Sequence, residues 1–231
     1  MNAPELLRHE LRRPSWKREE VALGTATDPY QAIEGRYRIT RGILEALRDF
    51  RTPVAIVTRC PMIVRDLDIL SEMAARAGVT VCVSLATMDP ARAREIEPTV
   101  APPPQRLRAV RALADRGIRT GVLLAPILPG LTDSNQHLAE VIQASADSGA
   151  SFVGHRVLYL GHVTKDAFLR FLDRRHPALL PLYRRLYPGQ YVPSSYEKAI
   201  ARVVAAEKAR VGSLEARYLR PPAAPEQMQL L

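Results

Sequence analysis

Five short apolar runs, each followed by a helical pattern, constrain the fold of this chain more than any other feature. The strand-like runs are 21–23, 54–57, 79–85, 119–125 and 151–158. The helical patterns, with apolar residues three and four positions apart, cover 37–50, 64–77, 107–117, 133–149 and a segment that starts at Thr164. Strands that alternate with helices pair in parallel, so the sequence predicts an α/β fold.

Two architectures fit such units, a doubly wound sheet and a barrel. The glycine-rich dinucleotide fingerprint and the phosphate-binding loop with its Lys are both absent from the sequence. We therefore expect part of a (β/α) TIM-like barrel over residues 1–175.

The chain changes character after residue 175. Residues 176–193 are rich in Pro and Tyr and are predicted to be a linker, and a helical pattern covers 195–214. Residues 176–220 thus form a C-terminal helical extension, and 221–231 are expected to be a disordered tail. Between Lys165 and Arg220, twelve Lys and Arg stand against five Asp and Glu. This excess suggests a polyanionic partner such as nucleic acid, although solvated arginines with no partner would give the same pattern.

Several classes of protein and site are disfavoured. No apolar run approaches the ~20 residues of a membrane helix, and the N-terminus lacks a signal pattern, so we expect a cytoplasmic protein. The two cysteines, Cys60 and Cys82, lie in or beside strands without metal-ligand spacing. They are expected to be buried and inert, and we assign no metal ligand.

Polar residues follow each strand, where a parallel barrel gathers its site. Arg59 could bind a carboxylate, and the hydroxyls of Thr25, Thr27 and Ser84 could bind a ribose or an amine. His162 is the best histidine candidate for this mouth. The strand ends hold no nucleophile beside a base and no carboxylate pair, so no catalytic residue is assigned. Difficult chemistry would need a cofactor.

Several motifs occur together at these strand ends. They are 24–31 (GTATDPYQ) with Glu34, 57–61 (VTRCP), 83–89 (VSLATMD), Glu97-Pro98 ahead of Arg106-Leu107, and 125–133 (APILPGLTD). Together they resemble the radical S-adenosylmethionine (SAM) proteins of the spore photoproduct lyase type, also labelled DNA repair photolyase-like, from about residue 2 to about 175.

The resemblance implies a (β/α)6-type barrel with a [4Fe–4S] cluster that cleaves SAM to a 5′-deoxyadenosyl radical, which abstracts hydrogen from a substrate. It implies SAM contacts in three regions. The Gly24–Asp28 stretch, including Thr25 and Thr27, would meet the amino group or methionine moiety. Arg59, where the family usually has Lys, would pair with the carboxylate. Ser84 would meet the ribose or carboxylate, and the turn from Pro126 through Pro129 to Gly130 would flank the adenine.

One departure from the family is large. Its cluster is held by CxxxCxxC after the first strand, and this motif is absent here. The resemblance therefore leaves five of six barrel units, and we expect a truncated or degenerate member without radical activity. An unpaired sheet edge, open to dimerisation, would follow from the missing strand.

Two further functions remain open. One is a non-catalytic nucleic-acid-binding or accessory protein that uses the basic C-terminal region. The other is an unrelated barrel lyase or aldolase, which is disfavoured because the strand ends carry no suitable Lys, His or carboxylate constellation.

Overall fold

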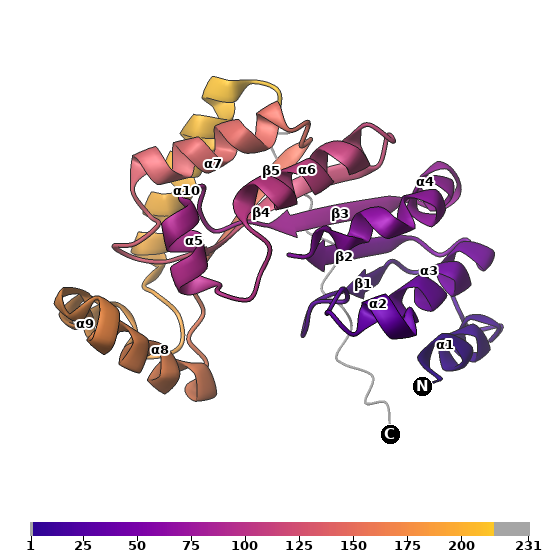
Figure 1. Ribbon diagram of the computed structural model, residues 1–231, viewed down its shortest axis with the longest axis horizontal. Helices are drawn as coiled ribbons and strands as arrows, with labels where there is room; N and C mark the ends of the chain where they lie inside the picture. Colours follow the sequence, from indigo (N-terminus) through magenta and orange to yellow (C-terminus); the bar gives the residue numbers. More distant parts are fainter. Residues whose placement is uncertain (1, 215–231) are drawn as a thin grey trace.

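The fold is built on one sheet of five parallel strands in the order β1-β2-β3-β4-β5. The computed structural model describes residues 2–214. The strands are β1 (Val21–Leu23), β2 (Val54–Thr58), β3 (Val79–Ser84), β4 (Arg119–Ile127) and β5 (Phe152–Val157). Among them, β1 and β5 do not pair with each other, so the barrel is not closed (Figure 1). The predicted α/β class and partial barrel are confirmed.

Helices connect and flank these strands. Before the third strand lie α1 (Ala3–Leu11), α2 (Glu34–Tyr37), α3 (Ile39–Asp49), the 3₁₀ helix η1 (Pro61–Asp66) and α4 (Leu67–Arg76). After it come α5 (Pro90–Ile96), α6 (Pro103–Ala114) and α7 (Asn135–Asp147). The last group is α8 (His162–Arg175), the 3₁₀ helix η2 (Pro177–Leu179), α9 (Leu180–Leu186) and α10 (Ser194–Val211).

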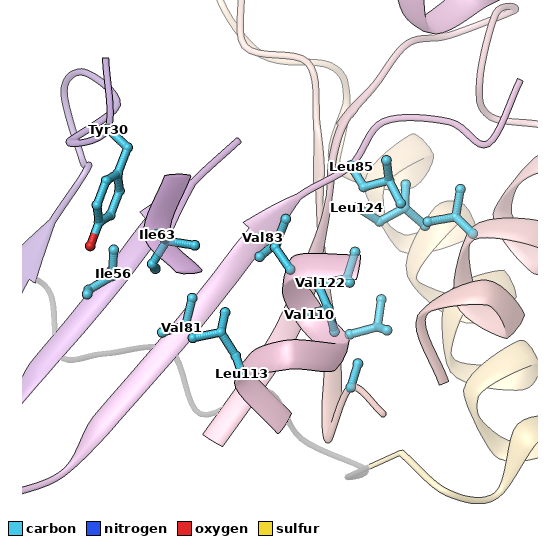
Figure 2. Packing of buried hydrophobic residues seen from close by; sticks show 14 of the residues in the cluster. Tyr30, Ile56, Ile63, Val81, Val83, Leu85, Val110, Leu113, Val122 and Leu124 are labelled. Carbon is cyan, nitrogen blue, oxygen red and sulfur yellow. The ribbon is translucent and has the colours of Figure 1, made fainter. Parts of the chain in front are cut away.

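The sequential strand order places the connecting helices on one face of the sheet. Parallel crossovers are almost always right-handed, and a sheet wound in one direction then carries its helices on the same side. Figure 2 shows the resulting core, in which Val81 and Val83 of β3 lie near Val110 and Leu113 of α6. All four side chains are buried. The opposite face of the sheet is the inner face of the partial barrel.

Strand register assigns residues to this inner face. Partners across a parallel ladder point to the same side, so Val57, Cys82, Gly121 and Phe152 form one inward row. Gly121 is required there, because a Cβ at this position would lie 2.3 Å from the Phe152 ring. The carboxyl ends of all five strands consequently open toward one edge of the partial barrel.

The segment after α8 differs from its prediction as a loop-rich linker. Residues 177–186 form η2 and α9, and Tyr183 and Tyr187 are fully buried with their rings stacked. The periodicity was hidden because prolines begin both helices, where a missing N–H costs nothing. The predicted tail 221–231 lies outside the described residues.

The helix α7 begins one residue after its cap. Ser134 caps it by accepting a hydrogen bond from the His137 N–H. Asp133 instead accepts hydrogen bonds from the Gly130 N–H and the Tyr196 hydroxyl.

Within residues 2–214, no helix has both the length and the apolar character needed to cross a bilayer.

Candidate functional site

A cleft of about 960 Å³ opens at the carboxyl ends of β4 and β5. Its walls come from the end of α5, the segments after β4 and β5, and α8. The lining side chains are mostly apolar or aromatic, and include Pro126, Leu128, Leu158, Tyr159, Leu160, Phe168 and Phe171. A large, mostly apolar cavity at the carboxyl edge of a parallel sheet is the usual place for an organic ligand.

Glu97 is a carboxylate of this cleft with two different cationic partners. It follows α5, and its side chain is only 8% exposed. Its Oε2 lies 2.7 Å from Arg106 Nη2, whereas its Oε1 lies 3.3 Å from Arg59 Nη1. Oε2 is therefore held by a short contact with Arg106, and Oε1 makes a longer contact with Arg59.

Arg106 fixes Glu97 to the barrel. This arginine of α6 is 1% exposed, and all three of its nitrogens have partners. Its Nε donates to the Ala101 carbonyl at 2.7 Å and its Nη1 to the Ser84 carbonyl at 3.0 Å. A buried guanidinium needs such complete pairing, so Arg106 joins the end of β3 to the segment that carries Glu97.

The loop after β1 is fastened to the end of β2 by Asp28. The Asp28 Oδ1 accepts from the Tyr30 N–H at 2.9 Å and the Thr58 hydroxyl at 2.7 Å. Its Oδ2 accepts from the Arg59 N–H at 2.7 Å. Gly24 starts the loop at φ +90°, and a Cβ there would lie 2.0 Å from the Val57 carbonyl oxygen. Both residues thus hold the loop after β1 against the end of β2, and neither of them lines the cleft.

A second network of charged side chains joins the segment that follows this loop to α3 and η1. Glu34 is buried at the start of α2 and accepts from the Thr40 N–H at 2.9 Å. Arg65 donates to the Glu34 carbonyl at 3.0 Å and pairs with the buried Asp66 at 2.9 Å. The sequence singled out Glu34 as part of a motif but gave no sign of its partners, which are Thr40 of α3 and Arg65 of η1.

The other residues predicted for the site differ in their exposure and in whether they line the cleft. The Ser84 hydroxyl is buried and donates to the Ala125 carbonyl at 2.9 Å, while Pro129 is also buried. Thr25 and Thr27 are exposed on the loop after β1. Pro126, which follows a cis peptide bond, lines the cleft. Arg59 reaches the cleft through Glu97, with its own side chain 51% exposed.

His155 and His162 lie in different surroundings. His162 is exposed and lines the cleft at the start of α8. His155 lies on β5 on the other side of the strand, toward α10, where burial and the charge of Lys208 lower its pKa. Of these two, His162 is therefore the one available to a ligand in the cleft.

Glu95 is the second carboxylate of the cleft and is engaged elsewhere. Its Oε1 lies 3.0 Å from Arg175 Nε and 3.1 Å from His176 Nε2. The hydrogen bond from Arg175 holds the pKa of Glu95 below its usual range. These contacts join α5 to the end of α8 across the cleft.

The described residues do not suit an iron–sulfur cluster. Cys82 is buried, as predicted, but Cys60 is only partly buried, and neither forms a disulfide. No three His, Cys, Asp or Glu side chains within 2–214 are grouped so as to hold a metal ion. A [4Fe–4S] cluster needs several thiolates, and the whole chain has two cysteines.

No protein-family model matches the chain. An uncharacterized protein of Mycobacterium tuberculosis is 44% identical over 205 residues, covering 88% of this chain and 60% of that protein. An uncharacterized protein of Acidianus two-tailed virus is 33% identical over 147 residues, covering 62% of this chain and 48% of its own length. The chain thus spans about 60% of the length of the mycobacterial relative.

Solved structures of spore photoproduct lyase share the fold. A cysteine-to-serine mutant of that enzyme has a TM-score of 0.64 at 17% identity, covering 94% of this chain and 66% of the other. A double mutant with bound AdoMet and dinucleoside spore photoproduct has a TM-score of 0.61 at 20% identity, covering 94% and 67%. The resemblance found in the sequence is confirmed at the level of the fold.

The Asp28 contacts give a prediction about stability. Asp28→Asn removes the charge and one acceptor oxygen, so it should lower the free energy of unfolding by about 2 kcal/mol. Urea denaturation measures the loss, and hydrogen exchange at the Tyr30 and Arg59 amides should accelerate. Thr27→Ala, on the same loop but exposed, should change stability by less than about 0.5 kcal/mol. Equal effects of the two substitutions would contradict this role of Asp28.

Proposed function

We propose that this chain binds S-adenosylmethionine in the cleft at the ends of β4 and β5, as part of a radical SAM protein of the spore photoproduct lyase type. The observation that carries the proposal is the cleft itself, a largely apolar cavity at the strand ends whose two carboxylates, Glu95 and Glu97, come from the end of α5. A shared fold with a structure that contains AdoMet supports the choice of ligand.

The chemistry of the lining suits SAM. Pro126 and Leu128 offer apolar surface to an adenine ring, and Glu97 offers a carboxylate oxygen to hydroxyl or ammonium donors. Arg59, half exposed beside Glu97, offers a guanidinium to a carboxylate. The residues of this chain would bind and orient the ligand, and Tyr159 and His162 at the rim would limit access of water.

The residues of this chain would bind the ligand without supplying radical chemistry. Radical chemistry in the family is supplied by a [4Fe–4S] cluster, and the donor set described here does not fit one. Hydrogen abstraction would therefore need other residues that supply the cluster ligands, and we propose no step of it for this chain.

Blocking the cleft tests the proposal. Isothermal calorimetry should detect saturable SAM binding, and SAM should raise the melting temperature of the protein. Ala167→Trp introduces a bulky side chain at an exposed position of the cleft wall and should reduce affinity at least tenfold. Ala199→Trp, exposed on α10 away from the cleft, should leave affinity unchanged. Absence of SAM binding to the wild-type chain, or equal binding by both variants, would refute the proposal.

Iron content tests the conclusion about the cluster. After anaerobic reconstitution with iron and sulfide, the purified chain should retain no [4Fe–4S] absorption band, because two cysteines cannot complete its ligand set. Mössbauer spectroscopy would identify any iron that remains. A stable cluster with four iron atoms per chain would contradict this assignment of the ligands.

A second candidate function is nucleic-acid binding beside the cleft. Tyr159 and Tyr191 are 48% and 60% exposed, with ring centroids 5.0 Å apart. Exposed aromatic rings near cations are typical of surfaces on which unpaired bases stack. Arg156 of β5 and Lys198 of α10 line one shallow pocket and would supply such cations. Tyr191 and Lys198 belong to the basic region predicted from the sequence, and Tyr159 and Arg156 lie just before it along the chain.

Charge removal tests this second candidate. Four exposed cations, Arg184, Arg185, Lys198 and Arg202, are changed together to Gln. Affinity for single-stranded DNA should fall, and the slope of log affinity against log salt should flatten by roughly 0.7 for each phosphate that the variant no longer neutralises. The matched control changes Arg12, Lys17, Arg18 and Arg51, exposed toward the N-terminal side of the chain, to Gln. Equal losses in both variants would indicate a net-charge effect and count against a specific surface.

A further inference from the structure

The helices α8, η2 and α9 form a helical arm, residues 162–186, that supplies one wall of the cleft. We propose that this arm is a lid, held against the opposite wall by the contacts of Glu95 with Arg175 and His176. When these contacts break, the arm turns away from α5 and a ligand in the cleft is released. The lid rests on the proposed function for the identity of its ligand, whereas its movement can be measured without one.

The helical arm packs against itself as one unit. The ring centroids of Phe168 and Tyr183 lie 5.3 Å apart, and those of Tyr183 and Tyr187 are stacked at 5.6 Å. Lys165 Nζ donates to the carbonyls of Tyr187 at 2.6 Å and Gly189 at 3.1 Å. In Figure 1, α8 and α9 accordingly lie side by side at one end of the molecule. A displacement of the arm would therefore carry both helices together.

Two neighbouring segments connect the helical arm to the barrel. They are residues 158–161, which follow β5, and residues 187–191, which follow α9. The Leu160 N–H donates to the Gln190 carbonyl at 3.0 Å, so the two segments lie next to each other. Loop residues at the ends of helices are the usual hinges of a moving element. The arm can turn about this pair of segments while both of its ends stay attached.

Glu95 ties the helical arm to the opposite wall of the cleft. Its Oε1 lies 3.0 Å from Arg175 Nε and 3.1 Å from His176 Nε2. The side chains of Thr164 and Lys165 bond only to the two connecting segments. Outside these segments, every hydrogen bond or ion pair that joins the arm to the rest of residues 2–214 goes to Glu95.

The contacts of Glu95 are accessible enough to be reversible. The Arg175 side chain is 62% exposed, whereas those of His176 and Glu95 are 25% and 19% exposed. An ion pair with a largely exposed partner contributes little to stability and is screened by salt. Apolar packing, such as that of Leu179 against Gly130, adds attraction without fixing one orientation of the arm.

His176 links the contacts of Glu95 to the lining of the cleft. Its ring lies edge-on to Phe171, with the centroids 5.9 Å apart, and the Phe171 ring lies 5.7 Å from that of Phe168. Both phenylalanines line the cleft, as does Glu95 on the opposite wall. Loss of the contacts at Glu95 would therefore move a surface that a bound ligand touches.

Charge reversal tests the lid. Arg175→Glu sets two carboxylates against each other, so hydrogen–deuterium exchange of the α8 and α9 amides should accelerate about fivefold. Glu95→Arg should act similarly, because the new side chain faces Arg175. The double variant Glu95→Arg/Arg175→Glu restores an opposite pair and should exchange as slowly as the wild-type chain. Fraying of α8 caused only by a Glu in its last turn would not be reversed by Glu95→Arg.

Asp173→Arg is the matched control, because Asp173 is exposed on the same helix and has no ion pair within residues 2–214. It should leave exchange unchanged, and melting temperatures establish that each variant is folded. Unchanged exchange in Arg175→Glu, or no recovery in the double variant, would overturn the lid.

The release of S-adenosylhomocysteine tests whether the lid controls the ligand. Surface plasmon resonance should show faster dissociation from Arg175→Glu and recovery in the double variant. Faster exchange with an unchanged dissociation rate would overturn this control. If the wild-type chain bound no S-adenosylhomocysteine, the proposed function would fail, while the exchange rates would still decide whether Glu95 holds the arm.

Discussion

The buried guanidinium of Arg106 is the interaction on which the shape of the candidate site depends. A fully buried charge is tolerated only when its hydrogen-bonding groups are satisfied, and here they are satisfied by β3, by the 97–102 segment and by Glu97. The segment is thereby bound to the sheet at the point where β3 ends. Stability and site geometry are coupled through this one side chain.

Different contacts stabilise the two ends of the sheet edge at which the strands terminate. Near β1 and β2, carboxylates of the chain itself organise the backbone, with Asp28 and Glu34 each accepting several hydrogen bonds. Near β4 and β5, apolar side chains of α8 line the cleft. The buried Tyr183 and Tyr187 pack behind α8, where the Tyr183 ring contacts Phe168. Glu97 lies between the two regions and contacts Arg59 on one side and the cleft on the other.

The sequence predicted the elements that depend on local pattern. The strand Val54–Thr58 was visible as a continuous apolar run, and the amphipathic α3 was visible because its apolar residues repeat with the helical period. The helix α9 was missed because prolines and tyrosines disguise its period, and its buried Tyr183 is recognisable only once it packs against Phe168 of α8. The charge networks were missed for a related reason. The pairing of Arg106 with Glu97, or of Arg65 with Glu34, depends on tertiary distances that spacing along the chain does not encode.

A crystal structure of the chain with S-adenosylhomocysteine would show directly whether the cleft at the ends of β4 and β5 binds the adenosyl ligand. We expect the ligand in this cleft, beside Pro126 and Leu128, with the Arg106–Glu97 contact unchanged. A ligand bound elsewhere on the chain would contradict the proposed function.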